Sequence, residues 1–430
     1  MRWLFLIAVL GCSDDGVSAA DAGPDAAPDA SVNALRFPTV SDLPEVVEPP
    51  DPFVSLDGNA VATAEQWRTR RMPELRDLFE FYIYGVAPAD AAATATEVAV
   101  ETDLFGGAVV YETHELRYGP DGTPPITLSI FRPAGSGPFP TFLAINKCGA
   151  QSLTTEAVRA TESWIDGTCG ETVEESRGVR DALWPIETIV GRGFALATFH
   201  ESDVDPDDSL DFDFENGVHP HFASELEAAD VPPQTRWGTI AAWAYGMRRV
   251  VDYLKTRGDI AQIGVTGHSR RGKAALLAAA FDERIDLAVT HQSGTAGATL
   301  SRSFNGESVS AINLFFPLWF NDVFPDFGDN ETRLPVDQHL LLAMVAPRPL
   351  LVTNGSEDDW ADPPGALRAL EAAHPVYELL GSPGIVRDMA GEPALEADLG
   401  WAVRPGGHSL ELQDWELFLQ FAEHHFGGEQ

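Results

Sequence analysis

A single serine between a predicted strand and a predicted helix constrains the fold of this chain more than any other feature. Residues 260–266 form a short, mostly apolar run that predicts a buried strand, and the alanine- and leucine-rich residues 273–281 predict a helix. Ser269 lies between them in the run Gly-His-Ser-Arg-Arg-Gly-Lys. A sharp strand-to-helix turn exposes a serine hydroxyl, and the amino end of the helix favours developing negative charge. The run therefore predicts a nucleophile elbow, with a polar helix-capping turn as the alternative.

A base and an acid follow this serine in the order that such an elbow requires. His408 lies in a glycine-rich loop just before a helix predicted over residues 412–426. A neutral imidazole can accept the serine proton, and a carboxylate can fix its tautomer. We expect His408 to be that base. The candidates for the acid follow a predicted strand and are three consecutive carboxylates, Glu357, Asp358 and Asp359.

Predicted strands and helices alternate along most of the chain. The strands are expected over residues 140–146, 195–199, 262–266, 287–290 and 348–353, and the helices over residues 237–255, 273–281, 364–373 and 412–426. Such alternation predicts a mostly parallel sheet with helices on both faces. A hydrophobic content of 44% is ample for one large core. Together with the serine, acid and histidine in that order, these features predict an α/β-hydrolase fold in a single domain over residues 35–430.

The run around Ser269 resembles the nucleophile motif of glucuronoyl methylesterases, carbohydrate esterase family 15. Other runs resemble further parts of the same family: residues 184–187, 192–198, 203–207, 291–302, 334–349 and 357–363. The resemblance spans roughly residues 184–426 and is weaker over residues 37–170. It implies a serine esterase that needs no cofactor and cleaves 4-O-methyl-glucuronoyl esters between glucuronoxylan and lignin alcohols.

The resemblance also assigns roles to individual residues. Ser269 aligns with the nucleophile, His408 with the base, and Arg270 with an arginine that stabilises the oxyanion. An arginine offers five fixed donors, which suits a carbonyl oxygen that becomes charged only in the transition state. Lys273 aligns with a lysine that binds sugar hydroxyls, although a solvated lysine in the first helical turn is the simpler interpretation. The remaining residues aligned with the sugar pocket are Glu307 and Trp360, the latter with a core aromatic as its alternative.

Gln292 marks a departure from part of this family. Some members carry the catalytic acid at this position, after the strand that follows the nucleophile helix. A glutamine can orient a histidine by hydrogen bonding, but it cannot stabilise an imidazolium by charge. We therefore expect Gln292 to border the substrate site and the acid to come from the later loop. Alignment through Trp360 selects Asp358, with Glu357 in reserve.

The amino terminus predicts export. Residues 1–11 form a short charged and then apolar leader that resembles a bacterial lipoprotein signal, with Cys12 as the lipidated residue. Residues 12–34 are rich in Ala, Asp and Pro and predict a flexible tether. We expect a monomeric lipoprotein of the bacterial cell envelope or cell surface, attached to the membrane only through a lipid anchor.

Two further cysteines, Cys148 and Cys169, flank a polar loop. In an exported protein they are expected to form one disulfide, and two free buried thiols are the alternative.

The net charge of −38 excludes DNA or RNA as a partner, because phosphate binding needs a basic face. The acidic loop over residues 203–213 lacks the glycine and glutamate of a calcium-binding loop, so we expect a solvated loop near the mouth of the site and no metal. Two alternative functions stay open: an acetyl-xylan or other carbohydrate esterase, and a glycan-binding lipoprotein without activity.

Overall fold

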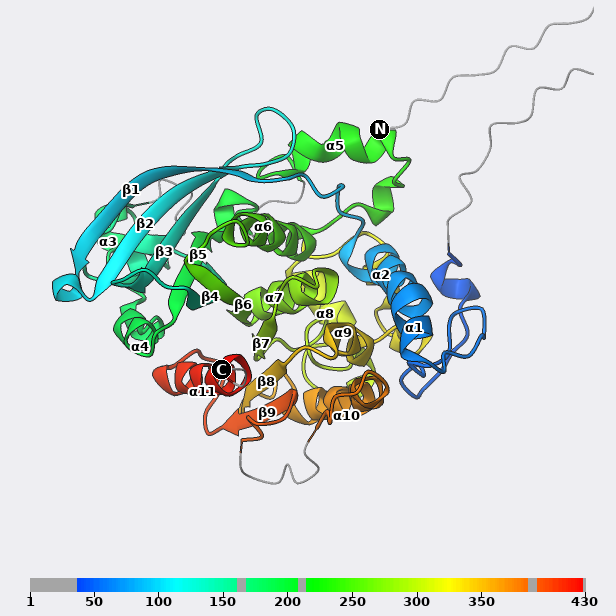
Figure 1. The fold of residues 1–430 in the computed structure, drawn as a ribbon. Coiled ribbons are helices and arrows are strands. Elements are labelled where there is room, and N and C mark those ends of the chain that lie inside the picture. The colour runs from blue at the N-terminus through cyan, green and yellow to red at the C-terminus, as the bar shows by residue number, and fades with distance from the viewer. Residues whose placement is uncertain (1–36, 161–167, 208–213, 386–392, 428–430) are drawn as a thin grey trace, which may run out of the picture. The chain divides into compact units, whose positions relative to one another are not determined.

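One sheet of nine strands runs through the part of the chain that begins at Phe37 (Figure 1). The computed structural model describes residues 37–160, 168–207, 214–385 and 393–427, and the expected leader, Cys12 and the linker lie outside them. From one edge of the sheet to the other the strands are β1 (Thr94–Leu104), β2 (Val109–Arg117), β3 (Ile126–Pro133), β5 (Ala195–His200), β4 (Phe139–Asn146), β6 (Ile260–His268), β7 (Leu287–His291), β8 (Leu350–Gly355) and β9 (Leu399–Arg404).

The sheet has a parallel part and an antiparallel part. Strands β4 to β9 pair in parallel, and β5, β7 and β8 are buried along their whole length, as expected for strands covered by helices on both faces. Strands β1, β2 and β3 pair in antiparallel fashion, and β3 joins β5 in the same way. The predicted α/β-hydrolase fold with a mostly parallel sheet is confirmed. Strands β1 to β3 were not predicted, because no helix separates them and β1 is a largely exposed, polar edge.

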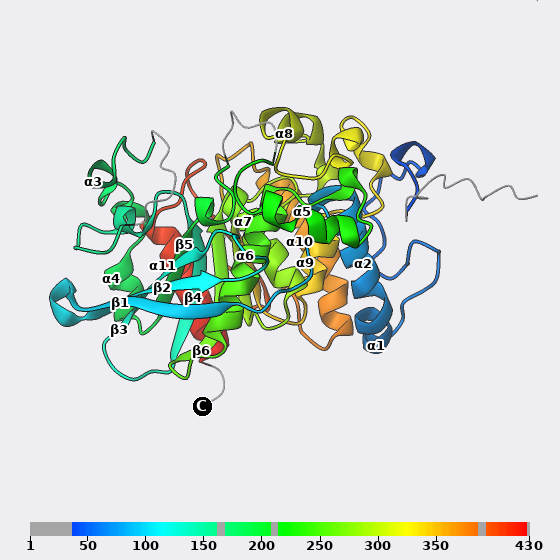
Figure 2. The same cartoon turned by 90° about the horizontal axis from the view of Figure 1, so that it is seen from above.

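Helices cover both faces of the sheet. They are α1 (Ala64–Gln66), α2 (Met72–Phe79), α3 (Val173–Ser176), α4 (Ile186–Gly191), α5 (His219–Ala228), α6 (Thr239–Leu254), α7 (Arg270–Phe281), α8 (Val309–Phe315), α9 (Gln338–Val345), α10 (Pro363–Leu379) and α11 (Leu412–Phe426). Helices α4 and α11 pack on one face, while α6 and α7 lie over the other (Figure 1). Figure 2, the view from above, shows β1 to β3 at one end of this arrangement and α2, α9 and α10 at the other.

Helix α10 is longer than the sequence predicts. The pattern predicts an end at Ala373, ahead of Pro375, because proline lacks the backbone N–H that a helix interior uses. The helix nevertheless continues to Leu379. Val376 and Tyr377, which follow the proline, are fully buried, so packing of the last turn compensates for the missing hydrogen bond.

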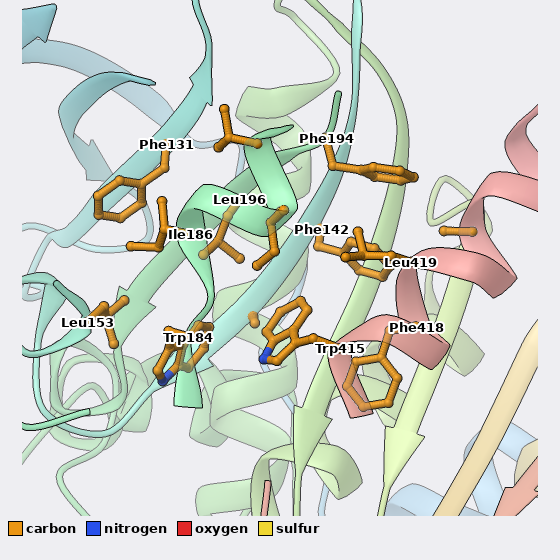
Figure 3. Packing of buried hydrophobic residues seen from close by; sticks show 14 of the residues in the cluster. Phe131, Phe142, Leu153, Trp184, Ile186, Phe194, Leu196, Trp415, Phe418 and Leu419 are labelled. Atoms are coloured by element: carbon orange, nitrogen blue, oxygen red, sulfur yellow. The ribbon is translucent and has the colours of Figure 1, made fainter. Parts of the chain in front are cut away.

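An aromatic core holds α11 against the sheet (Figure 3). The ring of Trp415 lies 6.0 Å from that of Phe142 on β4, 5.7 Å from Trp184 and 5.6 Å from Phe418, measured between ring centroids. Its indole N–H donates to the carbonyl of Leu183 at 2.9 Å. Because α11 begins four residues after His408, this packing also fixes where the histidine loop meets the sheet.

Cys148 and Cys169 form a disulfide, with their Cα atoms 5.4 Å apart, so the predicted pairing is confirmed. Both sulfur-bearing residues are buried, and Cys148 lies two residues beyond the end of β4. The bond ties the loop after β4 to a segment 21 residues later, at the same end of the sheet as the serine. Among the described helices, none is long and apolar enough to cross a membrane.

Candidate active site

Ser269 occupies the sharp turn between β6 and α7, with a φ of 59° and a ψ of −127°. Two glycines allow this turn. A Cβ atom at Gly267 would lie 2.3 Å from the Arg271 carbonyl oxygen, and one at Gly272 would lie 2.7 Å from the Gly267 carbonyl oxygen. The end of β6 and the start of α7 therefore approach each other closely, even though the second glycine comes one residue later than in the usual elbow pattern.

His408 and Asp358 form the pair that the sequence predicts. Their Nδ1 and Oδ2 atoms lie 2.7 Å apart, and the other Asp358 oxygen accepts a hydrogen bond from the Ala361 N–H at 3.2 Å. Asp358 is buried, while the neighbouring Glu357 is exposed, and its backbone N–H donates to the Gly406 carbonyl at 2.9 Å. Of the two candidates, Asp358 is thus the carboxylate that holds the imidazole. His408 and Ser269 line one cavity of about 210 Å³.

Arg270, the residue after the serine, is clamped beside this cavity. Its Nη1 donates to Asp207 Oδ2 at 2.6 Å, and its guanidinium lies 4.7 Å from the ring of Phe316 and 4.4 Å from that of Trp319. The two rings are stacked on each other, with centroids 3.7 Å apart, and the Trp319 indole also donates to Asp207. The guanidinium therefore keeps one orientation beside the serine.

Lys273, one turn into α7, is buried rather than solvated, so the simpler interpretation as a surface lysine is wrong. Its ammonium donates to the carbonyls of Ser293 and Thr295, each at 2.6 Å, and lies 3.7 Å from Glu307 Oε2. Burial lowers the pKa of Lys273 to about 8, partly offset by Glu307. Lys273 and Glu307 both line the cavity that contains Ser269.

Trp360 is 48% exposed and lines the same cavity, so it is not a core aromatic. Its backbone carbonyl accepts a hydrogen bond from the Glu307 N–H at 3.0 Å, which joins the loop after β8 to the loop before α8. The cavity consequently presents an indole beside a buried ammonium and a buried carboxylate.

Gln292 borders the cavity, but its amide is directed to the histidine loop. The side-chain N–H donates to the Gly407 carbonyl at 2.8 Å, and the side-chain oxygen accepts from the Ser409 N–H at 2.9 Å and from His268 Nε2 at 3.0 Å. Burial, together with His291 and His408 nearby, lowers the pKa of His268 well below its usual value. Gln292 thus forms hydrogen bonds with the residues directly before and directly after His408.

The described part of the acidic loop is not solvated, and the expectation of a solvated loop is wrong for it. Asp203 accepts from the backbone of Thr127 at 2.9 Å, Asp205 pairs with His219 at 2.8 Å, and Asp207 holds Arg270. Desolvated carboxylates need such partners. Three further members of the cluster lie outside the described residues: Asp208, Asp211 and Asp213. Among the residues that the structure describes, no group of three or more His, Cys, Asp or Glu could hold a metal ion.

The sequence alone did not single out Phe316, Trp319 or the partner of Arg270. The two aromatics stand three residues apart in an otherwise apolar stretch, which is typical of ordinary core packing. Asp207 was hidden among other acidic residues. Only the fold shows that these three side chains meet at one guanidinium.

The fold and this site define the chain as a carboxylic ester hydrolase with a serine elbow. The family model described as "Glucuronyl esterase, fungi" matches residues 232–381. Carbohydrate esterase MZ0003, from an unknown prokaryotic organism, is 37% identical over 88% of this chain and 90% of its own length. The 4-O-methyl-glucuronoyl methylesterase 1 of Wolfiporia cocos is 28% identical over 78% of this chain and 72% of its own length. The solved structure of a promiscuous CE15 esterase from a marine bacterial metagenome superposes with a TM-score of 0.81 at 36% identity, over 90% of this chain and 98% of that one. The chain belongs to carbohydrate esterase family 15.

Proposed function

We propose that this enzyme hydrolyses 4-O-methyl-glucuronoyl esters that link glucuronoxylan to lignin alcohols. The observation that carries the proposal is the content of one cavity: Ser269 and His408 share it with Lys273, Glu307 and Trp360. A site that cleaves the ester of a sugar acid needs a nucleophile for the ester carbonyl. It also needs hydroxyl-binding groups close by for the sugar ring attached to that carbonyl. The names of the matched family model and of the Wolfiporia cocos relative agree with that substrate.

The polar side of the cavity suits the sugar ring. Two of the three Lys273 N–H donors are held by backbone carbonyls, which leaves one donor for a substrate hydroxyl. Glu307, 3.7 Å away, supplies an acceptor for a neighbouring hydroxyl. The half-exposed indole of Trp360 offers an apolar face for the ring carbons.

Catalysis in this proposal proceeds through an acyl-enzyme. His408 Nε2 accepts the Ser269 proton while Asp358 holds Nδ1, and the Ser269 oxygen attacks the uronate carbonyl carbon. The tetrahedral intermediate collapses, the C–O bond to the alcohol breaks, and His408 returns the proton to the leaving alcohol. Water then attacks the acyl-enzyme with the same base, which releases the uronic acid and restores Ser269.

Charge on the carbonyl oxygen is stabilised from the start of α7. The guanidinium of Arg270 lies there at the amino end of α7, whose partial positive charge favours an oxyanion. The Asp207 contact and the stacked rings fix the guanidinium before substrate arrives, so little reorganisation is needed in the transition state.

The deciding experiment compares two substrates on the purified protein from Phe37 to Gln430. Methyl 4-O-methyl-glucuronate should be hydrolysed, and acetylated xylan should be cleaved far more slowly. Faster release of acetate than of methanol would contradict the proposal. The Ser269→Ala variant serves as the blank for both reactions.

We further propose that the mature protein is a monomer anchored in the cell envelope through a lipid on Cys12. The apolar leader supports this location, and the Cys148–Cys169 disulfide suits an oxidising compartment. Cys12→Ala should move the protein from the membrane fraction to the soluble fraction. An unchanged distribution, or a mature terminus other than Cys12 by mass spectrometry, would contradict the proposal.

A further inference from the structure

A second cavity lies next to the elbow and shares no residue with the cavity of Ser269. Its volume is about 330 Å³, compared with about 210 Å³ for the other. Different residues of the elbow line the two cavities. Gly267, His268 and Arg271 line the larger cavity, whereas Ser269 and Arg270 line the smaller.

The larger cavity has an apolar, aromatic wall. Its principal apolar side chains are Leu153, Leu183, Trp184, Leu410, Trp415 and Phe418. Figure 3 shows Leu153, Trp184, Trp415 and Phe418 gathered on one side of the sheet. The wall belongs to the aromatic core beneath α11, so its shape is fixed by packing.

The cavity adjoins the catalytic base. Ser409 and Leu410, which directly follow His408, form part of its lining. The ring of His268, another lining residue, lies 4.6 Å from the ring of His408. Since His408 returns the proton to the leaving alcohol, a pocket beside this histidine is placed to receive that alcohol.

The two cavities differ in chemistry as the two halves of the proposed ester do. Among the described residues that line the larger cavity, none is acidic, and its charged members are Lys147, Arg180 and Arg271. Arg271 forms an ion pair at 2.5 Å with Glu201, which does not line the cavity. A lining with several large apolar side chains and no carboxylate acceptor favours an aromatic ring with few hydroxyl groups over a polyhydroxylated sugar.

From this arrangement we infer that the larger cavity is the binding site for the lignin alcohol of the proposed substrate. The inference rests on the proposed function, because it takes the uronoyl group to occupy the smaller cavity. In an ester the acyl and alcohol portions extend in different directions from the carbonyl carbon. With the sugar ring against Lys273 and Trp360, the alcohol extends past His408 towards Leu410 and His268.

The test compares benzyl and methyl glucuronate on an enzyme whose larger cavity is filled. Leu183 is only partly buried on the cavity wall, so Leu183→Trp fills space with little disturbance of the core. The ratio of kcat/KM for the benzyl ester to that for the methyl ester should fall at least about tenfold, the effect of losing a well-filled apolar contact. The matched control is Leu412→Trp, at an exposed position on α11 that does not line the cavity, and it should leave the ratio unchanged.

The unaltered enzyme provides an independent measurement. Benzyl alcohol should inhibit hydrolysis of the methyl ester competitively at millimolar concentration, and methanol at the same concentration should not. An unchanged ester ratio in folded Leu183→Trp, or no inhibition by benzyl alcohol, would overturn the inference. If the methyl ester is hydrolysed but these effects are missing, only the proposed alcohol site is refuted. If neither ester is hydrolysed, the proposed function itself is refuted.

Discussion

The two cavities beside the elbow are built from neighbouring residues but differ in character. The smaller contains Ser269, His408 and the buried Lys273–Glu307 pair together with the aromatic rings of Trp319 and Trp360, while the larger is walled by tryptophan, leucine and phenylalanine and has no acidic residue among the described residues that line it. Successive residues of a helix point about 100° apart. The first turn of α7 therefore sends Arg270 and Arg271 to different cavities. The difference teaches that neighbouring residues of one short elbow can line two separate cavities.

The largest expected effect comes from removing the nucleophile of the smaller cavity. Ser269→Ala should lower kcat by more than about a thousandfold on every ester, and His408→Ala by a similar factor, because the two act as one unit. Kinetics on methyl glucuronate measures the loss, and an unchanged melting temperature serves as the control. Activity above about a thousandth of wild type would refute an acyl-enzyme on Ser269.

The next largest effect concerns the two loops that hold His408. Asp358→Asn should lower kcat by about a thousandfold or more, because the amide favours the wrong tautomer of the imidazole. Gln292→Ala removes two neutral hydrogen bonds to the histidine loop and should cost only about tenfold.

Gln292→Glu introduces a carboxylate beside His408 and tests whether the loop after β7 can supply the acid in place of Asp358. Combined with Asp358→Asn it should recover part of the lost kcat. If Gln292→Ala proved more damaging than Asp358→Asn, the loop after β7 would be the one that orients the base.

Arg270→Ala should reduce kcat by about a hundred- to a thousandfold with a smaller change in KM, as for the loss of one oxyanion donor. Arg270→Lys keeps the charge but not the planar fork, and should recover little. A rise in KM at constant kcat would instead place Arg270 in ground-state binding of the sugar.

Lys273→Ala should raise KM for methyl glucuronate by about tenfold or more, since it removes a charged donor to a hydroxyl. The same variant should have little effect on an aryl acetate, which has no sugar ring. Lys255→Ala, a lysine that pairs with Asp286 at the surface, is the matched control and should change neither value. Equal losses on both substrates would make Lys273 a structural residue of the elbow.

The smallest expected effect is a pH dependence of the same lysine. Its pKa of about 8 means that the ammonium loses its proton as the pH rises through 8. KM for the glucuronate ester should therefore increase several-fold between pH 7 and 9, and this increase should be absent in Lys273→Ala. In the unfolded chain the pKa of this lysine is about 10.5. Lys273 therefore destabilises the folded state below pH 8, and this destabilisation decreases as the pH rises from 8 to 10.5. A flat KM would show that the charge of Lys273 does not contribute to binding.

Local patterns were sufficient for the elements that surround the site. The predicted strand and helix around Ser269 and the predicted helix after His408 correspond to β6, α7 and α11, because apolar runs and helical periodicity are properties of short segments. Strands β1 to β3 escaped prediction because no helix separates them and β1 is a largely exposed edge, so the alternation of strands and helices does not mark them.

The sequence by itself determined the elbow, the order of serine, acid and histidine, and the cysteines that could pair. Each of these depends on residue type and spacing along the chain. Only the tertiary structure decided between Asp358 and Glu357, because adjacent residues of a loop point in different directions and only one reaches His408. It also decided that Lys273 is buried, that Asp207 meets Arg270, and that two separate cavities flank one turn. Burial and charge pairing arise between segments far apart in sequence, so no local pattern contains them.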